Sequence, residues 1–149
     1  MVTLVPLPNA EVKKLVDHWY FLLDMHANVG DVLPLLSHVD LEMQLPEATL
    51  RGYQEFISWY ERVTRTFFDE IHIIQRCEIT PSPDRSWAEV DIGVKWLAKR
   101  WRPPESKSEW LAFDASQRWV VIRSPHTQKP VIQTYTVNSL IPLEGSAEL

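Results

Sequence analysis

The chain has 149 residues, of which 45% are hydrophobic and 23% are charged. This composition excludes a disordered chain, and the length predicts one domain over residues 1–149. The single cysteine, Cys77, excludes a disulfide framework and a zinc site built from several thiolates. The net charge of -5 argues against a nucleic-acid partner, because phosphate binding needs clustered Lys and Arg.

The N-terminal segment has neither a basic region nor a long apolar region, so we expect no signal peptide. No run approaches the roughly 18 apolar residues that a membrane span requires. We therefore expect no membrane partner and a cytoplasmic location, which suits a chain with one lone thiol.

The first half of the chain shows helical periodicity. Apolar residues recur at intervals of three and four, which predicts a helix from an N-cap at Asn9 to about Ala27. A short helix capped by Asp31 is expected from Val32 to Ser37. A third helix is expected from near Gly52 to near Asp69, because aromatic and aliphatic residues again follow one face.

The remaining segments have the alternation of strands. Apolar and polar residues alternate in a first strand from Val39 to Pro46. The run from Trp87 to Trp101 exceeds the usual ~3–10 residues of a strand, so we expect a bulge at Gly93. Short turns between successive strands require antiparallel pairing. The other expected strands are Ile71 to Ile79, Glu109 to Phe113 with Gln117 to Arg123 (one strand or a bulged pair), and Val131 to Leu140.

Three helices, one early strand and a following meander predict an α+β fold, with the helices on one face of a curved antiparallel sheet. This order resembles the nuclear-transport-factor-2-like superfamily, in its SnoaL-like branch. The local likeness lies in the helix-to-turn stretch Leu22 to Asp31, the strand Val39 to Leu45, Gly52 at the start of a helix with an aromatic face, and the closing hairpin of Gln117 to Arg123 and Val131 to Tyr135.

The resemblance implies a cone-shaped domain, in which the sheet and three N-terminal helices on its concave face enclose a pocket at the open end. Members include isomerases, cyclases, dehydratases and epoxide hydrolases that act on small apolar molecules. Other members are binding or assembly modules without chemistry. Because the same fold serves all of these roles, the function has to be inferred from the residues of the site.

Ketosteroid-isomerase-like members carry a carboxylate base on the first strand. Counted back from Gly52 without a gap, this position is Met43, which cannot take a proton. Glu42 is its neighbour, and a loop difference of one residue would turn it inward. Otherwise Glu42 is a solvated edge residue. The acid that such isomerases place on a late strand falls near Trp119, which cannot supply a proton either.

His72 is the second candidate for proton transfer. A histidine titrates near neutral pH, and dehydratase-like members use pocket histidines. The alternative, which the sequence favours, is a structural histidine bonded to Asp69 or to a backbone carbonyl. Asp24 and His26 lie two apart on a helix, so we expect them not to face each other, with Asp24 towards the following turn. No histidine spacing predicts a metal site, and we expect no cofactor.

The seven tryptophans are the strongest compositional signal. Aromatic walls with a few polar tips are typical of a site for an apolar small molecule. The alternatives are that these rings form ordinary core, or that a dimer buries them on the outer face of the sheet. The expected ligand-binding residues are Trp19, Tyr20, Trp59, Tyr60, Trp96, Gln117, Trp119 and Tyr135.

Two functional hypotheses follow, and the first needs no catalytic residues. In this first hypothesis, the protein binds a small apolar ligand or a partner protein and forms a homodimer through its sheet. In the second, it is a lyase, isomerase or hydrolase in which His72 or Glu42 moves a proton and Tyr60 or Gln117 holds an oxygen. A third possibility is a small structural subunit, like the dioxygenase beta chains that resemble this fold.

Overall fold

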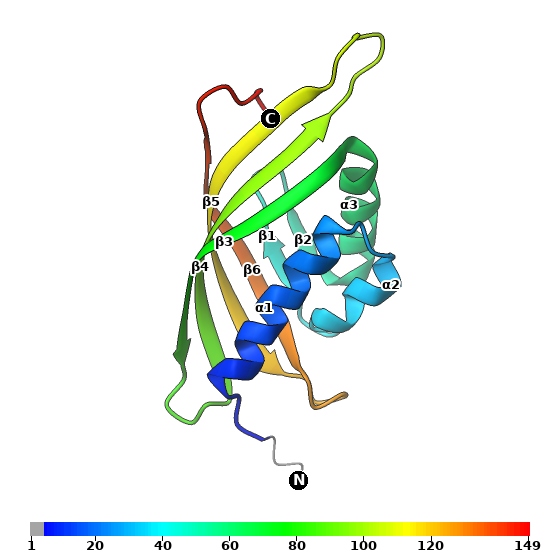
Figure 1. Cartoon of the computed structure of the whole chain (residues 1–149). Helices are drawn as coiled ribbons and strands as arrows, with labels where there is room; N and C mark the ends of the chain where they lie inside the picture. The colour runs from blue at the N-terminus through cyan, green and yellow to red at the C-terminus, as the bar shows by residue number, and fades with distance from the viewer. Residues whose placement is uncertain (1–4) are drawn as a thin grey trace.

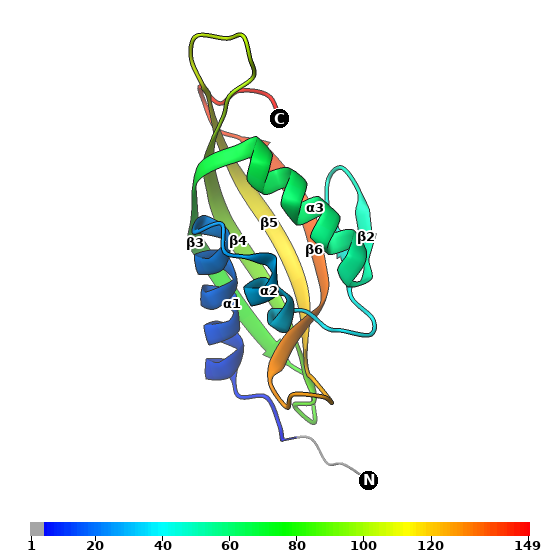
Figure 2. The same ribbon diagram turned by 90° about the vertical axis from the view of Figure 1, so that its right-hand side faces the viewer.

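The computed structural model describes residues 5–149. Helices α1, α2 and α3 lie on one side of a curved sheet whose strand order is β2-β1-β6-β5-β4-β3 (Figure 1). The view in Figure 2 shows the helices in front of the concave face. The expected α+β architecture is therefore confirmed. The elements are α1 (Asn9–Asp24), α2 (Val29–Val32), a 3-10 turn η1 (Leu33–Leu35), β1 (Glu42–Gln44), β2 (Thr49–Arg51), α3 (Gly52–Thr66), β3 (Phe67–Pro81), β4 (Trp87–Arg100), β5 (Glu109–Arg123) and β6 (Pro130–Pro142).

The helix ends differ from the predicted ones. Pro8 is the N-cap of α1, so Asn9 is already helical, and the helix ends at Asp24 rather than near Ala27. It ends there because His26 adopts a left-handed backbone with φ 50°. The second helix begins at Val29 and continues into η1, which contains Pro34. Helix α3 ends at Thr66, because the next residue already has extended backbone and pairs with β4.

The first expected strand, Val39 to Pro46, forms a ladder only at Glu42–Gln44, and β2 was not predicted. Three residues are too few for an alternating pattern to stand out. Strand β1 pairs antiparallel with β2 but parallel with β6, which corrects the expectation of a wholly antiparallel sheet. Short turns require antiparallel pairing only between strands that are adjacent in sequence, whereas α3 and four strands separate β1 from β6.

The bulges of the long hairpin lie in β3 and not at Gly93. Pairing with β4 shifts between Phe68 and Ile71 and again between Ile74 and Arg76. Gly93 has a different role, because a Cβ there would lie 2.8 Å from the Arg76 guanidinium. The expected pair of segments at residues 109–123 is one continuous strand, β5.

The core fills the space between α1 and the concave face of the sheet. The Trp19 and Trp119 side chains are fully buried, and their rings meet edge to face at 6.1 Å. Trp119 also stacks on Tyr135, with ring centroids 5.2 Å apart. Within residues 5–149, no helix is long and apolar enough to cross a membrane.

Candidate functional site

A cavity of about 500 Å³ lies between α3 and the concave face of β3 to β6. Its walls are mostly apolar, and its polar residues include Glu70, His72 and Gln117. A volume of this size falls in the range of small-molecule sites. Of the residues expected to bind a ligand, the cavity is lined by Trp59, Tyr60, Trp96, Gln117 and Tyr135.

The other expected wall residues lie behind this lining. Trp19 and Trp119 are part of the solid core, with no exposed surface. Tyr20 is also buried and does not belong to the cavity lining. Large rings on the correct face of an element cannot be divided into wall and core from their spacing, because both positions are apolar.

Asp24, the last residue of α1, forms a hydrogen-bonded pair with His72, which lies in β3 and lines the cavity. The His72 Nδ1 lies 2.6 Å from Asp24 Oδ1, and the His72 backbone N–H donates to Asp24 Oδ2 at 3.2 Å. Asp24 therefore fixes both the ring and the strand that carries it. The expected partner of His72, Asp69 or a backbone carbonyl, is wrong, because the ring nitrogen binds Asp24. Asp24 does not face the turn beyond Ala27 as we expected, because α1 ends beside β3.

A second acid–histidine pair lies next to the first. His26 Nε2 lies 2.5 Å from Glu70 Oε2, and the Trp96 indole N–H donates to Glu70 Oε1 at 3.0 Å. The Glu70 side chain is only 11% exposed, whereas that of His26 is 27% exposed. This carboxylate is thus held by two nitrogen donors at the cavity wall, and His26 connects it with solvent.

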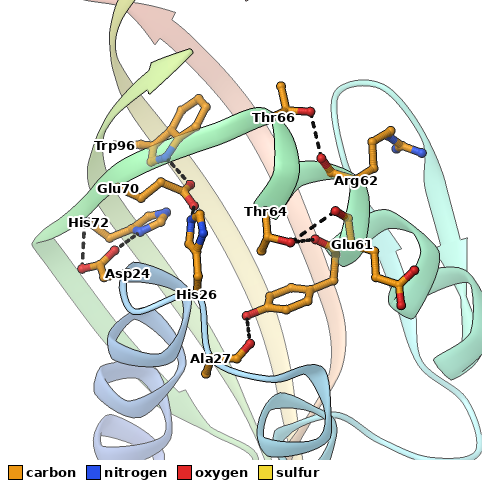
Figure 3. A network of polar contacts seen from close by, with 11 residues as sticks. Asp24, His26, Ala27, Glu61, Arg62, Thr64, Thr66, Glu70, His72 and Trp96 are labelled. Atoms are coloured by element: carbon orange, nitrogen blue, oxygen red, sulfur yellow. Dashed lines mark hydrogen bonds and ion pairs between the residues drawn. The ribbon is translucent and has the colours of Figure 1, made fainter. Parts of the chain in front are cut away.

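The two pairs connect the same two segments. Asp24 is the last residue of α1 and His26 follows it closely, whereas Glu70 and His72 lie near the start of β3. Each acid binds the histidine of the other segment (Figure 3). Their spacing suggests Asp24 and His26 only as partners of each other. The sequence signal for the observed pairs is the repetition of acid–x–His at residues 24–26 and 70–72.

A bulge at the start of β3 brings these side chains to the cavity. Asp69 has φ 51°, and the register against β4 gains one residue between Phe68 and Ile71. In a regular strand, residues 67 and 70 would face opposite sides of the sheet. With the extra residue, Phe67, Glu70 and His72 all line the cavity.

Gln117 is the buried donor of the site. Its Oε1 accepts the Tyr20 hydroxyl at 2.6 Å and the Trp119 indole N–H at 3.2 Å. Because the oxygen is held by two donors, the amide NH₂ is the part of Gln117 that is left for the cavity. Such a group can hold a ligand oxygen, as the sequence led us to expect.

The tyrosine hydroxyls of the wall are not free acids. Tyr60 donates to the backbone carbonyl of Ala27 at 2.5 Å, so its ring lines the cavity while its hydroxyl faces α1. Burial, followed by the charges of Glu70 and Asp31, raises the pKa of Tyr60 to about 12. Burial likewise raises the pKa of Tyr135 to about 12. Neither hydroxyl is suited to proton transfer near neutral pH.

Glu42 lies outside the cavity lining. Its carboxylate accepts from the Gln44 side chain at 2.9 Å and lies 3.9 Å from Arg51, on the solvated side of β1. The inward position belongs to Met43, which is fully buried. In the part of the chain that the structure describes, no group of three or more acidic, His or Cys side chains is arranged to hold a metal ion.

No protein-family model and no curated protein sequence matches the chain. Among solved structures, a hexachlorocyclohexane dehydrochlorinase from Novosphingobium barchaimii is similar, with a TM-score of 0.73, 14% identity, and coverage of 95% of this chain and 93% of that chain.

A nuclear-transport-factor-2-like superfamily protein from Salmonella enterica has a TM-score of 0.70 and 13% identity, with coverage of 93% of this chain and 91% of that chain. A protein from Nostoc punctiforme with a cystatin-like fold has a TM-score of 0.69 and 14% identity, with coverage of 99% and 100%. At such identities the likeness concerns the fold. The chain therefore has the cone-shaped, cystatin-like fold of the nuclear-transport-factor-2-like superfamily.

Proposed function

We propose that this protein is an enzyme that removes a proton from carbon in a small apolar molecule, with His72 as the base. The single observation that supports this proposal is the Asp24–His72 pair at the wall of the cavity. A histidine whose Nδ1–H is held by a carboxylate presents its Nε2 lone pair as a base. The apolar walls select an apolar substrate and exclude water from the proton transfer.

The reaction begins when His72 Nε2 takes a proton from a substrate carbon. The electron pair of the broken C–H bond forms a carbon–carbon double bond. In a lyase, a leaving group departs and the imidazolium releases its proton to solvent. In an isomerase, an adjacent carbonyl oxygen takes the negative charge, and the imidazolium then returns the proton to another carbon of the enolate. The Gln117 amide can donate to that oxygen, because Tyr20 and Trp119 fix its orientation.

Asp24 acts as a positioning residue in this scheme. It sets the tautomer of His72 and stabilises the imidazolium that forms. The similar hexachlorocyclohexane dehydrochlorinase supports a lyase, because dehydrochlorination is the loss of a proton and a chloride.

The experiment uses nitrobenzisoxazole, a small aromatic probe whose ring opens when a base removes its C–H proton. We expect the protein to accelerate ring opening, and we expect Asp24→Asn and His72→Ala to lower the rate roughly 100-fold or more. His18→Ala is the matched control, because His18 is exposed on the same helix as Asp24. No acceleration by the wild-type protein, or equal rates in all variants, would refute the proposal.

A second candidate is a non-catalytic protein that binds a small apolar ligand, favoured by the fully buried Met43 at the position where related isomerases carry a base. It is tested by soaking the protein in a metabolite extract and identifying the retained compound by mass spectrometry. Retention with no turnover of that compound supports a binding protein. In either role, Trp59→Ala or Trp96→Ala should weaken binding, because both rings line the cavity.

We also propose a homodimer formed through the outer face of the sheet. Successive strand residues alternate between faces, so Ile71 and Ile73, which flank His72, point outward and are exposed. Trp110 and Ile141 are further exposed apolar residues of β5 and β6. Light scattering should give the mass of two chains for the wild type and of one chain for Ile73→Asp. Phe21→Asp on α1 is the control that should stay dimeric, and a monomeric wild type would exclude the dimer.

A cytoplasmic location remains part of the proposal. The lone thiol of Cys77 is compatible with a reducing compartment, since the chain cannot form an internal disulfide. Fractionation of expressing cells, with immunodetection of the untagged chain, tests the location.

A further inference from the structure

The proposed reaction uses Asp24 and His72 but leaves the Glu70–His26 pair without a role. Glu70 is a carboxylate in the wall of a mostly apolar cavity, where an unpaired charge is costly. Its two oxygens each take one N–H, from His26 and from Trp96. A carboxylate oxygen has two lone-pair positions, so each oxygen can accept one further hydrogen bond.

The backbone around this pair is shaped to hold it there. His26 and Asp69 both have left-handed φ values, 50° and 51°, although neither is a glycine. The first ends α1 so that the imidazole reaches Glu70, and the second makes the bulge that turns Glu70 inward. Left-handed backbone is uncommon outside glycine, but histidine and aspartate adopt it more readily than most other residues, so both positions suit the residues that occupy them.

We propose that Glu70 is the substrate-recognition group of the cavity, and that it accepts a hydrogen bond from a hydroxyl on the substrate. The substrate class is then an apolar, ring-sized molecule with a hydroxyl donor near the carbon that loses its proton to His72. This inference rests on the proposed function in placing the substrate in the same cavity. It assigns to Glu70 binding and selection, not proton removal.

The chemistry favours a neutral hydroxyl over a cationic donor. A hydroxyl loses less solvation free energy than an ammonium group on entering apolar surroundings. Hydrogen bonds to an ionised carboxylate are about twice as strong as those between neutral groups. Glu70 can therefore discriminate between ligands that carry a hydroxyl donor and ligands that lack one. His26 and Trp96 act as positioning residues, because each of them binds one of the two Glu70 oxygens.

The test compares the binding of naphthol and of its methyl ether, methoxynaphthalene, by quenching of tryptophan fluorescence. The ether has the same ring system but cannot donate a hydrogen bond. We expect the wild type to bind naphthol at least tenfold more tightly than the ether. Glu70→Gln should remove most of this preference while it leaves the affinity for the ether unchanged.

The controls separate Glu70 from its neighbours. Glu47 also lines the cavity and accepts an indole N–H, from Trp59 at 2.7 Å, so Glu47→Gln should keep the preference. His26→Asn, which tolerates the left-handed backbone, should reduce it in part.

Any of four results would overturn the inference: no binding in the wild type, no preference for naphthol in the wild type, an unchanged preference in Glu70→Gln, or a preference lost equally in Glu47→Gln. The ring-opening assay fails or succeeds independently of these affinities. A protein without base catalysis can therefore still support the assignment of Glu70, and the two proposals fail separately.

Discussion

The Tyr20 hydroxyl donates a hydrogen bond of 2.6 Å to Gln117 Oε1, across 97 residues of sequence. Both groups are buried, and this bond connects α1 with the floor of the cavity on β5. It determines which end of the Gln117 amide is available to a ligand. The orientation of a cavity side chain therefore depends on Tyr20, which does not line the cavity.

Tyr20→Phe should consequently affect both stability and turnover. Loss of the hydroxyl removes one of two donors to Gln117, which should lower the free energy of unfolding by about 1 kcal/mol. Turnover of nitrobenzisoxazole should also fall, because the amide can rotate. Urea denaturation and the ring-opening assay measure the two effects.

Tyr53→Phe is the control for this variant. The Tyr53 hydroxyl donates to the backbone carbonyls of Leu33 and Leu36, at 2.9 and 2.8 Å, away from the cavity lining. It should lose stability but retain turnover. Equal turnover in both variants would contradict the role given to Tyr20.

The buried tyrosines predict a loss of stability at alkaline pH. Burial raises the pKa of Tyr135 from 10.0 to about 12, so between these values the unfolded chain releases a proton that the folded chain retains. The contribution of Tyr135 to the free energy of unfolding is therefore fully present below pH 10 and is lost as pH rises towards 12. For Tyr135 the loss is on the order of 2 kcal/mol. Urea denaturation across this pH range measures it.

Tyr135→Phe should make the alkaline loss shallower, because phenylalanine has no proton to release. Burial raises the pKa of Tyr20 well above its ordinary value in the same direction, so part of the loss should remain in this variant. An unchanged pH dependence in Tyr135→Phe would show that other groups cause it.

The distinction between core and wall tryptophans predicts different costs of truncation. Trp119→Ala should lower the free energy of unfolding by about 3–5 kcal/mol, because the ring is fully buried and leaves a hole. Trp59→Ala should cost clearly less, since the half-buried ring borders a cavity that already exists. Denaturant midpoints compare the two variants, and equal losses would place Trp59 in the core.

The contacts of Arg100 with Glu109 and Glu148 should make the packing of the C-terminal segment against β4 and β5 sensitive to acid. Its guanidinium binds both oxygens of Glu109 at 3.1 Å and donates to the Glu148 carbonyl at 2.6 Å. Hydrogen bonding to Arg100 lowers the pKa of Glu109. The contribution of this pair is therefore present above the ordinary carboxyl pKa and is lost as pH falls through the lowered value.

Hydrogen exchange measures this attachment. The Ala147 amide, which donates to the Trp110 carbonyl, should exchange faster in Arg100→Met than in the wild type. Arg102→Met is the matched control, because its guanidinium is more exposed and lies 3.6 Å from Glu109. Similar protection in Arg100→Met would show that the backbone bonds alone hold the segment.

The sequence alone determined the class of the fold and the elements that surround the cavity. Helical spacing identified α1 and α3, and alternation identified β3 to β6, because these patterns reflect which face of an element is buried. Residue types further identified His72 and Gln117 as candidates for chemistry. Alternation also placed β1 inside a longer expected strand, Val39 to Pro46, but β2 was not predicted, since three residues are too few for the pattern to stand out.

Only the tertiary structure decided which side chains meet. Asp24 and His72 are 48 residues apart, and no local pattern reports a contact between two segments. The bulge at Asp69 then changed which residues of β3 face inward, and it did so through one extra residue in the pairing with β4. Periodicity records burial along one element, whereas a site depends on the register between elements, which is set when they pack together.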